Sequence, residues 1–302
     1  MSDFASNHPA VSPYTTLISA EELATLRFGD NDIQVWDCSF DLMQPGAGRT
    51  AFMQTHIAGA RYIDLDMDLS DKTGAADAAS GGRHPLPSRE KFAAWLGGKG
   101  VTPTTQIIVY DRNGCNYCGR AWWMLQWLGH RGAAVLDGGL QAWQALGGAQ
   151  ENSIENPVSG KFKAQNYPLS HTEYAQAAIN FVADCVRAGS HTLVDARAAP
   201  RFRGEVEPLD PVAGHIPGAL NRPFGQNMAA DGKFKSAALL RQEFDALLAG
   251  RDPSKVIHHC GSGVSALPNV LAMAIAGYAP TALFAGSWSE WSNRADLPVA
   301  QG

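Results

Sequence analysis

The sequence predicts an α/β protein made of two tandem domains, each a parallel sheet with helices on both faces. Three observations lead to this prediction. The chain has 302 residues, which is enough for two domains of ordinary size. Its segments recur twice in the same order, which indicates a duplicated domain. Within each copy, short apolar runs rich in β-branched residues alternate with helical patterns, as they do in parallel sheets covered by helices.

Composition excludes several classes of protein. Hydrophobic residues make up 45% and charged residues 18%, the net charge is −5, and no basic run stands out, so nucleic acid is not an expected partner. The longest apolar region, 266–286, is interrupted by Pro268 and Pro280 and predicts a helix, a turn and a strand rather than a membrane span. The N-terminal residues lack a secretory pattern. Without one, an odd number of cysteines predicts free thiols and a cytoplasmic location.

The two copies match at four places along the chain. "VWDCS" is matched by "LVDAR", "THIAGARYID" by "GHIPGALNRP", "IIVYDRNG" by "VIHHCGSG", and "LDGGLQAW" by "LFAGSWSEW". The first copy carries a longer insertion around "DKTGAADAASGGRHPLPS". We therefore expect a first domain over 1–150, a polar linker over 151–168 marked by Pro and Gly, and a second domain over 169–302.

The elements of the second copy can be assigned in order. "HTLVDAR" and "KVIHHC" predict buried strands, and "SAALLRQEFDALLAG" and "SALPNVLAMAIAGY" predict helices that end at glycine. Cys260 follows the second of these strands and precedes the second helix. Ligands of open α/β sheets bind at the carboxyl ends of strands, so Cys260 lies where a reactive group is expected.

The loop "CGSGVS" predicts an anion-binding site around the sulfur. Gly261 and Gly263 permit backbone torsions that other residues resist, and the amides of 261–265 can curl inward as a nest. The following helix N-terminus also favours the thiolate over the thiol. The alternative is a buried cysteine that acts as a small hydrophobe, which we disfavour because a core cysteine does not require a Gly-x-Gly loop.

Other thiols and imidazoles give weaker signals. His258 and His259 are neighbours on a strand and point to opposite faces, which favours structural histidines over a metal site with Cys260. Cys115 and Cys118 form a C-x-x-C without the second pair that zinc would need, so a redox pair and two unrelated thiols both stay open, the latter favoured. The first copy has Asp111 where the second has its cysteine, and we expect that half to be catalytically silent.

On these motifs the chain resembles the two-domain rhodanese-type sulfurtransferases, from about Leu17 to Pro298. The loop "CGSGVS" is closest to the 3-mercaptopyruvate branch of that family, with Ser265 in place of threonine. The thiosulfate branch carries basic side chains after the cysteine, where this chain has Gly261 and Ser262. The resemblance implies two tandem rhodanese-like domains, the second of them catalytic.

The resemblance also implies roles for residues outside the loop. Arg201, in "DARAAPRFRGE", matches the arginine that holds the anionic group of the donor. A second arginine of the family is missing, since "EPLD" offers Leu209 or Asp210 at that place. Arg203 or Arg197 could compensate, although for Arg197 a salt bridge is the favoured role.

Three further residues match a proposed relay in the family. Asp66 and His84 would join Ser262 in a hydrogen-bond chain that moves a proton. The alternative is that Asp66 is a turn residue and that His84 packs against Pro85.

The implied reaction is sulfur transfer through a persulfide. The Cys260 thiolate takes sulfur from 3-mercaptopyruvate and passes it to a thiol, to cyanide or to a protein dithiol such as a thioredoxin-like protein. Backbone amides of Gly261, Gly263, Val264 and Ser265 hold the sulfur, and no metal or organic cofactor is expected. Neither nucleic acid nor a membrane is an expected partner, and a monomer is expected.

Three alternatives to this function stay open. The first is thiosulfate sulfurtransferase activity. The second is a cysteine phosphatase, which would need an arginine where the chain has Ala266. The third is a non-catalytic module of the same fold.

Overall fold

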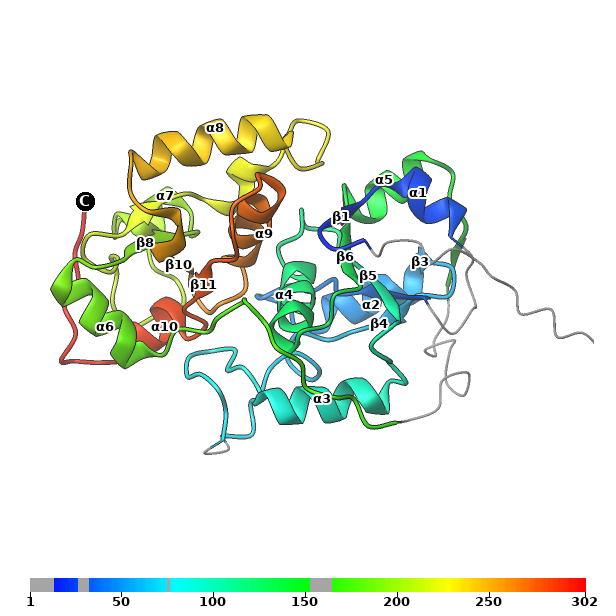
Figure 1. Ribbon diagram of the computed structural model, residues 1–302, viewed down its shortest axis with the longest axis horizontal. Coiled ribbons are helices and arrows are strands. Elements are labelled where there is room, and N and C mark those ends of the chain that lie inside the picture. The colour runs from blue at the N-terminus through cyan, green and yellow to red at the C-terminus, as the bar shows by residue number, and fades with distance from the viewer. Residues whose placement is uncertain (1–13, 27–32, 75–76, 153–164) are drawn as a thin grey trace, which may run out of the picture.

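The computed structural model describes residues 14–26, 33–74, 77–152 and 165–302. The described chain forms two α/β units, each built on its own parallel sheet (Figure 1). This confirms the predicted fold class. Most of the predicted linker, 153–164, lies outside the described residues.

The first sheet has five parallel strands in the order β1-β6-β5-β2-β4. Apolar side chains of its strands alternate between two cores, with Val35 on one face and Trp36 on the other. Helices cover both faces, because each core also takes in helical residues, such as Leu23 and Trp143 in one and Phe92 in the other. The strands are β1 (Leu17–Ile18), β2 (Ile33–Asp37), β4 (Arg61–Tyr62), β5 (Gln106–Tyr110) and β6 (Ala133–Leu136), and the helices are α1 (Ala20–Thr25), α2 (Ala47–Gln54), α3 (Arg89–Gly98), α4 (Cys118–Leu128) and α5 (Gly139–Ala145).

The second sheet has four parallel strands in the order β11-β10-β8-β9. Ile257 faces one core with Val182 of the first helix, while Val256 faces the other with Phe244. The strands are β8 (Thr192–Asp195), β9 (Leu220–Asn221), β10 (Val256–His259) and β11 (Ala282–Leu283). The α-helices are α6 (Ile179–Ala188), α7 (Ala199–Phe202), α8 (Ala237–Leu248), α9 (Leu267–Ile275) and α10 (Ser287–Trp291), and two short 3-10 turns are η1 (Phe224–Asn227) and η2 (Pro253–Lys255).

The duplication is visible in matched histidines. His56, in the short strand β3 (His56–Ile57) that pairs with β7 (Gln150–Glu151), stacks on Phe52 at 3.8 Å and bonds its carbonyl oxygen at 2.7 Å. His215 stacks on Phe202 at 3.8 Å and bonds its carbonyl oxygen at 2.8 Å. Each histidine ties the crossover segment to the helix or turn before it, so the two copies share internal packing as well as sequence.

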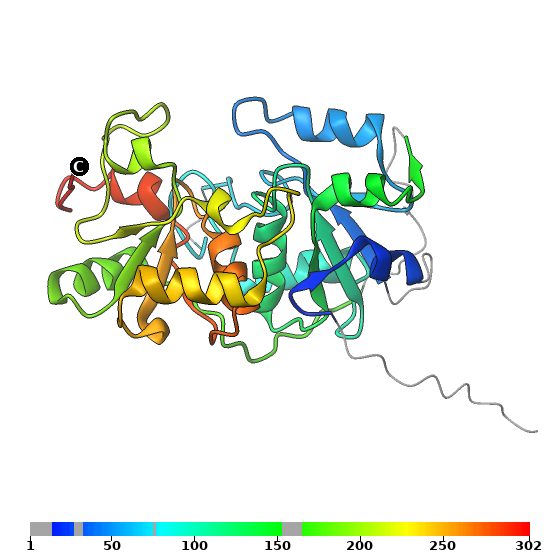
Figure 2. The same ribbon diagram turned by 90° about the horizontal axis from the view of Figure 1, so that it is seen from above.

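The two units share one core through α4 and α9, which lie side by side between the sheets (Figure 1 and Figure 2). A methyl group added at Gly119 of α4 would lie 3.3 Å from Leu267 at the start of α9. The segment before α6 also rests on the first unit, since Tyr167 bonds His130 at 2.7 Å. The boundaries expected at 151, 168 and 169 stay predictions.

Candidate active site

The Cys260 loop connects the end of β10 to the start of α9. Gly263 has φ +72°, and a Cβ there would lie 2.2 Å from the carbonyl oxygen of Ala285, so only glycine fits this position. Gly261 has no such clash, and the atoms nearest to its missing Cβ are the guanidinium nitrogens of Arg201 and Arg83. Gly263 is therefore required by the backbone conformation, whereas Gly261 leaves room for the two guanidinium groups beside it.

The amides of the loop are available to an anion. The N–H groups of residues 261–265 donate no hydrogen bond to any described residue. The carbonyl oxygens of Cys260 and Gly261 point the other way and accept from the amides of Trp288 at 3.0 Å and Ser289 at 2.8 Å. Successive amides without acceptors, beside a helix N-terminus, form the kind of nest that the sequence predicts.

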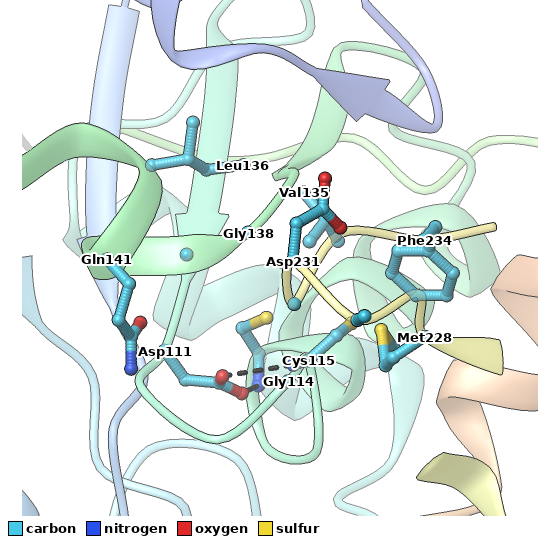
Figure 3. Close-up of a pocket in the computed structure, with 14 residues that line it drawn as sticks. Asp111, Gly114, Cys115, Val135, Leu136, Gly138, Gln141, Met228, Asp231 and Phe234 are labelled. Carbon is cyan, nitrogen blue, oxygen red and sulfur yellow. Dashed lines mark hydrogen bonds between the residues drawn. The ribbon is translucent and has the colours of Figure 1, made fainter. Parts of the chain in front are cut away.

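The first copy gives an internal test of what such a loop binds. Asp111 stands in place of the cysteine, and its carboxylate accepts hydrogen bonds from the amides of Asn113, Cys115, Tyr117 and Cys118 at 2.8–3.1 Å. Figure 3 shows Asp111 beside Cys115. Both loops reach their helix seven residues after this position. The loop therefore holds a carboxylate in the first copy, and in the second copy Cys260 stands at the equivalent position.

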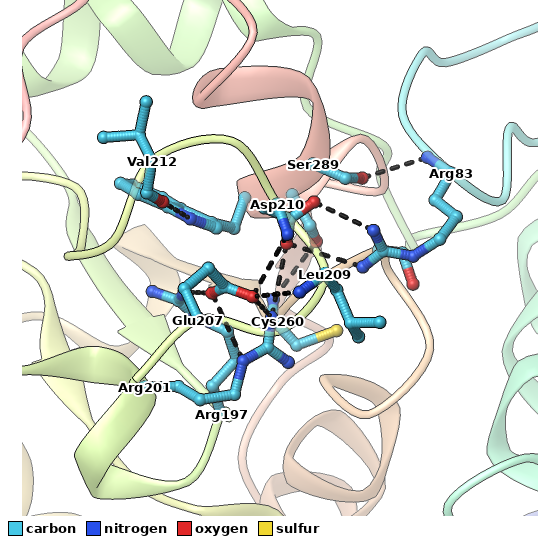
Figure 4. A network of polar contacts seen from close by, with 12 residues as sticks. Arg83, Arg197, Arg201, Glu207, Leu209, Asp210, Val212, Cys260 and Ser289 are labelled. Atoms are coloured by element: carbon cyan, nitrogen blue, oxygen red, sulfur yellow. Dashed lines mark hydrogen bonds and ion pairs between the residues drawn. The ribbon is translucent and has the colours of Figure 1, made fainter. Parts of the chain in front are cut away.

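Cys260 itself is closed from solvent, with 1% of its surface exposed. The segment 207–212 reaches the arginines beside the loop, where Asp210 pairs with Arg83 and Arg201 (Figure 4).

The predicted relay residues come together across the two units. Ser262 Oγ lies 2.8 Å from His84 Nδ1, and His84 Nε2 lies 3.4 Å from Asp66 Oδ1. Burial, and then the charges of Arg120 and Lys72, lower the pKa of His84 to about 3. His84 is therefore neutral near pH 7, when Nδ1 can accept the proton of Ser262 while Nε2–H faces Asp66.

Two basic residues at this relay were not predicted from the sequence. Lys72 Nζ lies 2.6 Å from Asp66 Oδ1. Arg120 of α4 is fully buried and donates to the carbonyl oxygens of Gly263 and His84, each at 3.0 Å, and to that of Leu69. Burial lowers the pKa of Arg120 to about 9, opposed by the charge of Cys260. An arginine inside the apolar run "CGRAWWML" was the available signal.

Arg201 lies beside the loop and is held by carboxylates. Its Nε and Nη2 donate to Glu207 at 3.2 and 2.5 Å, and Nη2 is 3.3 Å from Asp210 (Figure 4). Asp210 also accepts from Arg83, at 2.9 Å. Arg83 belongs to the first unit, and its approach to the loop was not predicted either.

The other two arginines named from the sequence lie elsewhere. Arg197 is buried, bonds Asp195 at 2.7 Å and Glu207 at 3.3 Å, and stacks over Trp288. Arg203 pairs with the exposed Glu205 at 2.7 Å and makes no contact with the loop.

The remaining candidate thiols and imidazoles do not converge on one ion. His258 Nε2 contacts the sulfur of Met273 at 3.2 Å, whereas His259 lies 3.9 Å from Asp195. Over the described ranges, no group of three or more His, Cys, Asp or Glu is arranged to hold a metal.

Cys115 and Cys118 line a cavity of about 340 Å³ between the units (Figure 3), where burial raises the pKa of Cys118 well above its usual value. In the same described ranges, no helix has the length and apolar character needed to cross a membrane.

Comparison with known proteins agrees with this geometry. The rhodanese-like domain model matches residues 19–146 and 181–294. A probable 3-mercaptopyruvate sulfurtransferase of Pseudomonas aeruginosa is 42% identical over 95% of this chain and 98% of its own. A putative thiosulfate sulfurtransferase of Mycobacterium tuberculosis is 40% identical over 95% and 97%. The structure of 3-mercaptopyruvate sulfurtransferase from Leishmania major superposes with a TM-score of 0.78 at 28% identity, covering 95% of this chain and 75% of that one. Both halves are matched, and the chain belongs to the rhodanese-like domain family, of which it carries two copies.

Proposed function

We propose that the protein is a 3-mercaptopyruvate sulfurtransferase that carries sulfur as a persulfide on Cys260. The observation that carries this proposal is the run of amides at 261–265, directly after Cys260, that donate no hydrogen bond within the described ranges, with Arg201 beside the loop. The names of relatives at 42%, 34% and 35% identity support the same donor. The loop side chains that follow Cys260 are uncharged, which fits an organic thiol donor better than thiosulfate.

The first half-reaction forms a sulfur–sulfur bond and breaks a carbon–sulfur bond. The Cys260 thiolate attacks the sulfur of 3-mercaptopyruvate, and the electron pair of the broken bond stays on carbon as the enolate of pyruvate. The enolate takes up a proton, and the enzyme is left as Cys–S–SH. Amides of the loop stabilise the negative charge of the Cys260 thiolate before this step.

The relay and Arg201 have distinct roles in this proposal. Ser262, hydrogen-bonded to neutral His84, passes on the proton that the enolate takes up, while the thiol proton of the donor stays on the outer sulfur, and Asp66 orients the imidazole. Arg201 pairs with the carboxylate of the donor in a charge-assisted contact. Arg201 is close enough to act there, since its Nη1 lies 3.5 Å from the missing Cβ of Gly261.

The second half-reaction returns the enzyme to its starting state. A thiol, cyanide or a protein dithiol attacks the outer sulfur, and the Cys260 thiolate leaves. We keep a thioredoxin-like protein as a proposed acceptor, a monomer as the proposed state and the cytoplasm as the proposed location. All five cysteines lie among the described residues and are unpaired, which supports a reducing compartment.

Intact mass spectrometry tests the proposal directly. Wild-type protein incubated with 3-mercaptopyruvate should gain the mass of one sulfur atom, and Cys260→Ser should gain none. The absence of a gain on the wild type contradicts the proposal.

Thiosulfate sulfurtransferase activity is the second candidate, favoured by the relative at 40% identity that bears this name. The ratio of kcat/KM for the two donors decides between them, and a larger value for thiosulfate would reverse the assignment. A cysteine phosphatase would need a cation at position 266, where this chain has a buried alanine, so p-nitrophenyl phosphate should not be hydrolysed.

A further inference from the structure

We propose that Arg83 of the first unit is the second arginine that binds the carboxylate of the donor, and that Asp210 occupies its binding position when no donor is present. The inference rests on the proposed function and adds a specificity-determining residue to it. It also supplies the second cation whose place in the sequence, at Leu209 or Asp210, holds no arginine.

Two guanidinium groups meet at the first glycine of the loop. Arg83 Nη2 and Arg201 Nη1 each lie 3.5 Å from the position that a Cβ on Gly261 would take. One arginine comes from each unit, and both reach the mouth of the loop that holds Cys260 (Figure 4). Because Gly261 has no side chain, both guanidinium groups can approach the backbone of the loop this closely.

An anion already lies between the two arginines. The Asp210 carboxylate is 2.9 and 3.5 Å from the two terminal nitrogens of Arg83 and 3.3 Å from Arg201 Nη2. Its side chain is only 2% exposed, so this is a shielded carboxylate between two cations. A donor carboxylate entering here would find the same pair of charges.

Asp210 leaves part of the donor capacity of the two arginines unused. Arg83 Nε is buried and has no acceptor among the described residues. Arg201 Nη1 likewise makes no hydrogen bond within the described ranges. An α-keto acid presents three oxygens and can satisfy more of these donors than one aspartate does.

The backbone holds Arg83 at this position. Its N–H donates to Ser289 Oγ at 3.0 Å, and a Cβ on the preceding Gly82 would lie 2.5 Å from the carbonyl oxygen of Gly286. The next residue is His84, which bonds Ser262. One short segment of the first unit therefore reaches both the donor site and the relay.

The test compares two donors that differ only in the carboxylate. Mercaptoacetone has a methyl group where 3-mercaptopyruvate has its carboxylate, so it cannot use the arginine pair. Arg83→Gln should raise the KM for 3-mercaptopyruvate about ten- to a hundredfold, the range for a lost hydrogen bond to a charged group. Its kcat/KM for mercaptoacetone should stay within about twofold of wild type.

Asp210→Asn tests the exchange itself. Removing the competing charge should lower the KM for 3-mercaptopyruvate and again leave mercaptoacetone unchanged. Arg203→Gln is the matched control, because the Arg203 side chain is 44% exposed and, among the described residues, pairs only with Glu205, and it should match wild type on both donors. Arg83→Lys keeps the charge without the planar donor pair and should give a KM between wild type and Arg83→Gln, which keeps the test open if Arg83→Gln does not fold.

Inhibition by pyruvate gives a binding measurement independent of turnover, and it should weaken in Arg83→Gln by the same factor as the KM rises. Equal losses of kcat/KM on both donors would overturn the proposal, since they would show that Arg83 positions the neighbouring His84 and does not bind the donor carboxylate. A raised KM in Asp210→Asn would overturn the exchange. Failure of the proposed function is distinguishable, because wild-type protein would then gain no sulfur from 3-mercaptopyruvate at all.

Discussion

Cys260 and Asp111 occupy equivalent places, and the contrast between them shows what a single residue decides. Four amides bind the Asp111 carboxylate in the first unit, so that loop already contains its anion. At Cys260 the equivalent amides of Ser262, Val264 and Ala266 donate no hydrogen bond within the described ranges, and that of Leu267 donates to the carbonyl oxygen of Val264. The residue at this one position therefore decides whether the loop amides are taken up by a carboxylate of the loop itself.

Removing the buried cation Arg120 should slow the reaction of Cys260. Arg120→Met leaves the carbonyl oxygens of Gly263 and His84 without their donor, and each loss should lower the unfolding free energy by about 1–3 kcal/mol. The substitution also removes a positive charge that interacts with Cys260. The rate of alkylation by iodoacetamide at pH 7 should fall at least several-fold, and Arg120→Lys should recover part of it. An unchanged rate in a folded Arg120→Met protein would exclude a role for this charge.

Ser262 and His84 should act as one unit in catalysis. Each of Ser262→Ala and His84→Gln should lower kcat by about 10²–10⁴ if the pair transfers a proton. The double variant should then lose little more than either single one, because the hydrogen bond of 2.8 Å is already broken. Additive losses in kcat would show that the two residues work separately.

At the scale of the element, the β10–α9 connection depends on the conformation of one glycine. Gly263→Ala combines an unfavourable φ with a Cβ placed 2.2 Å from a backbone oxygen, so the loop must shift. We expect a lower melting temperature and loss of persulfide formation. Gly218→Ala is the matched control, with φ +78° and nothing within 4 Å of the added carbon, and should cost only about 1–2 kcal/mol. Equal effects of both variants would contradict the close packing at Gly263.

The strands and helices that position the site follow from local patterns, and the sequence predicts them for that reason. "KVIHHC" and "SALPNVLAMAIAGY" correspond to β10 and α9, because apolar periodicity and glycine ends report directly on burial and helix termination. The proximity of Cys260, Ser262, Arg201, His84 and Asp66 was expected from a family resemblance, and the structure brings these side chains together. Arg83 and Arg120 were missed because their partners Asp210 and Gly263 lie far along the chain, in contacts that depend on how the two units pack, whereas Lys72 pairs with the nearby Asp66 in a loop that has no regular pattern.

At the scale of the whole molecule, buried neutral histidines set the response to acid. Burial is the largest cause that lowers the pKa of His84 and His258 to about 3 and of His130 to about 4. Between these values and 6.5, the unfolded chain binds protons that the folded chain excludes, so stability is fully present above pH 6.5 and falls as pH drops.

Each such histidine should cost about 2 kcal/mol of unfolding free energy at pH 5 relative to neutral pH. Urea denaturation of the wild type at pH 7 and pH 5 should therefore give a lower midpoint at pH 5, and His130→Gln should show a smaller decrease. Identical pH dependence in the two proteins would show that His130 is not held neutral.

The core that α4 and α9 share also limits how the protein can be divided. A second half expressed on its own would keep the nucleophile but lose Arg83, His84 and Arg120, and it would expose the apolar side of α9 to water. The two copies are therefore comparable to a covalently linked dimer whose units contribute different residues to one site. Under the proposed function, the first unit supplies Arg83, His84 and Arg120 to the Cys260 site of the second unit, so that each polypeptide carries one such site where two identical subunits would carry two.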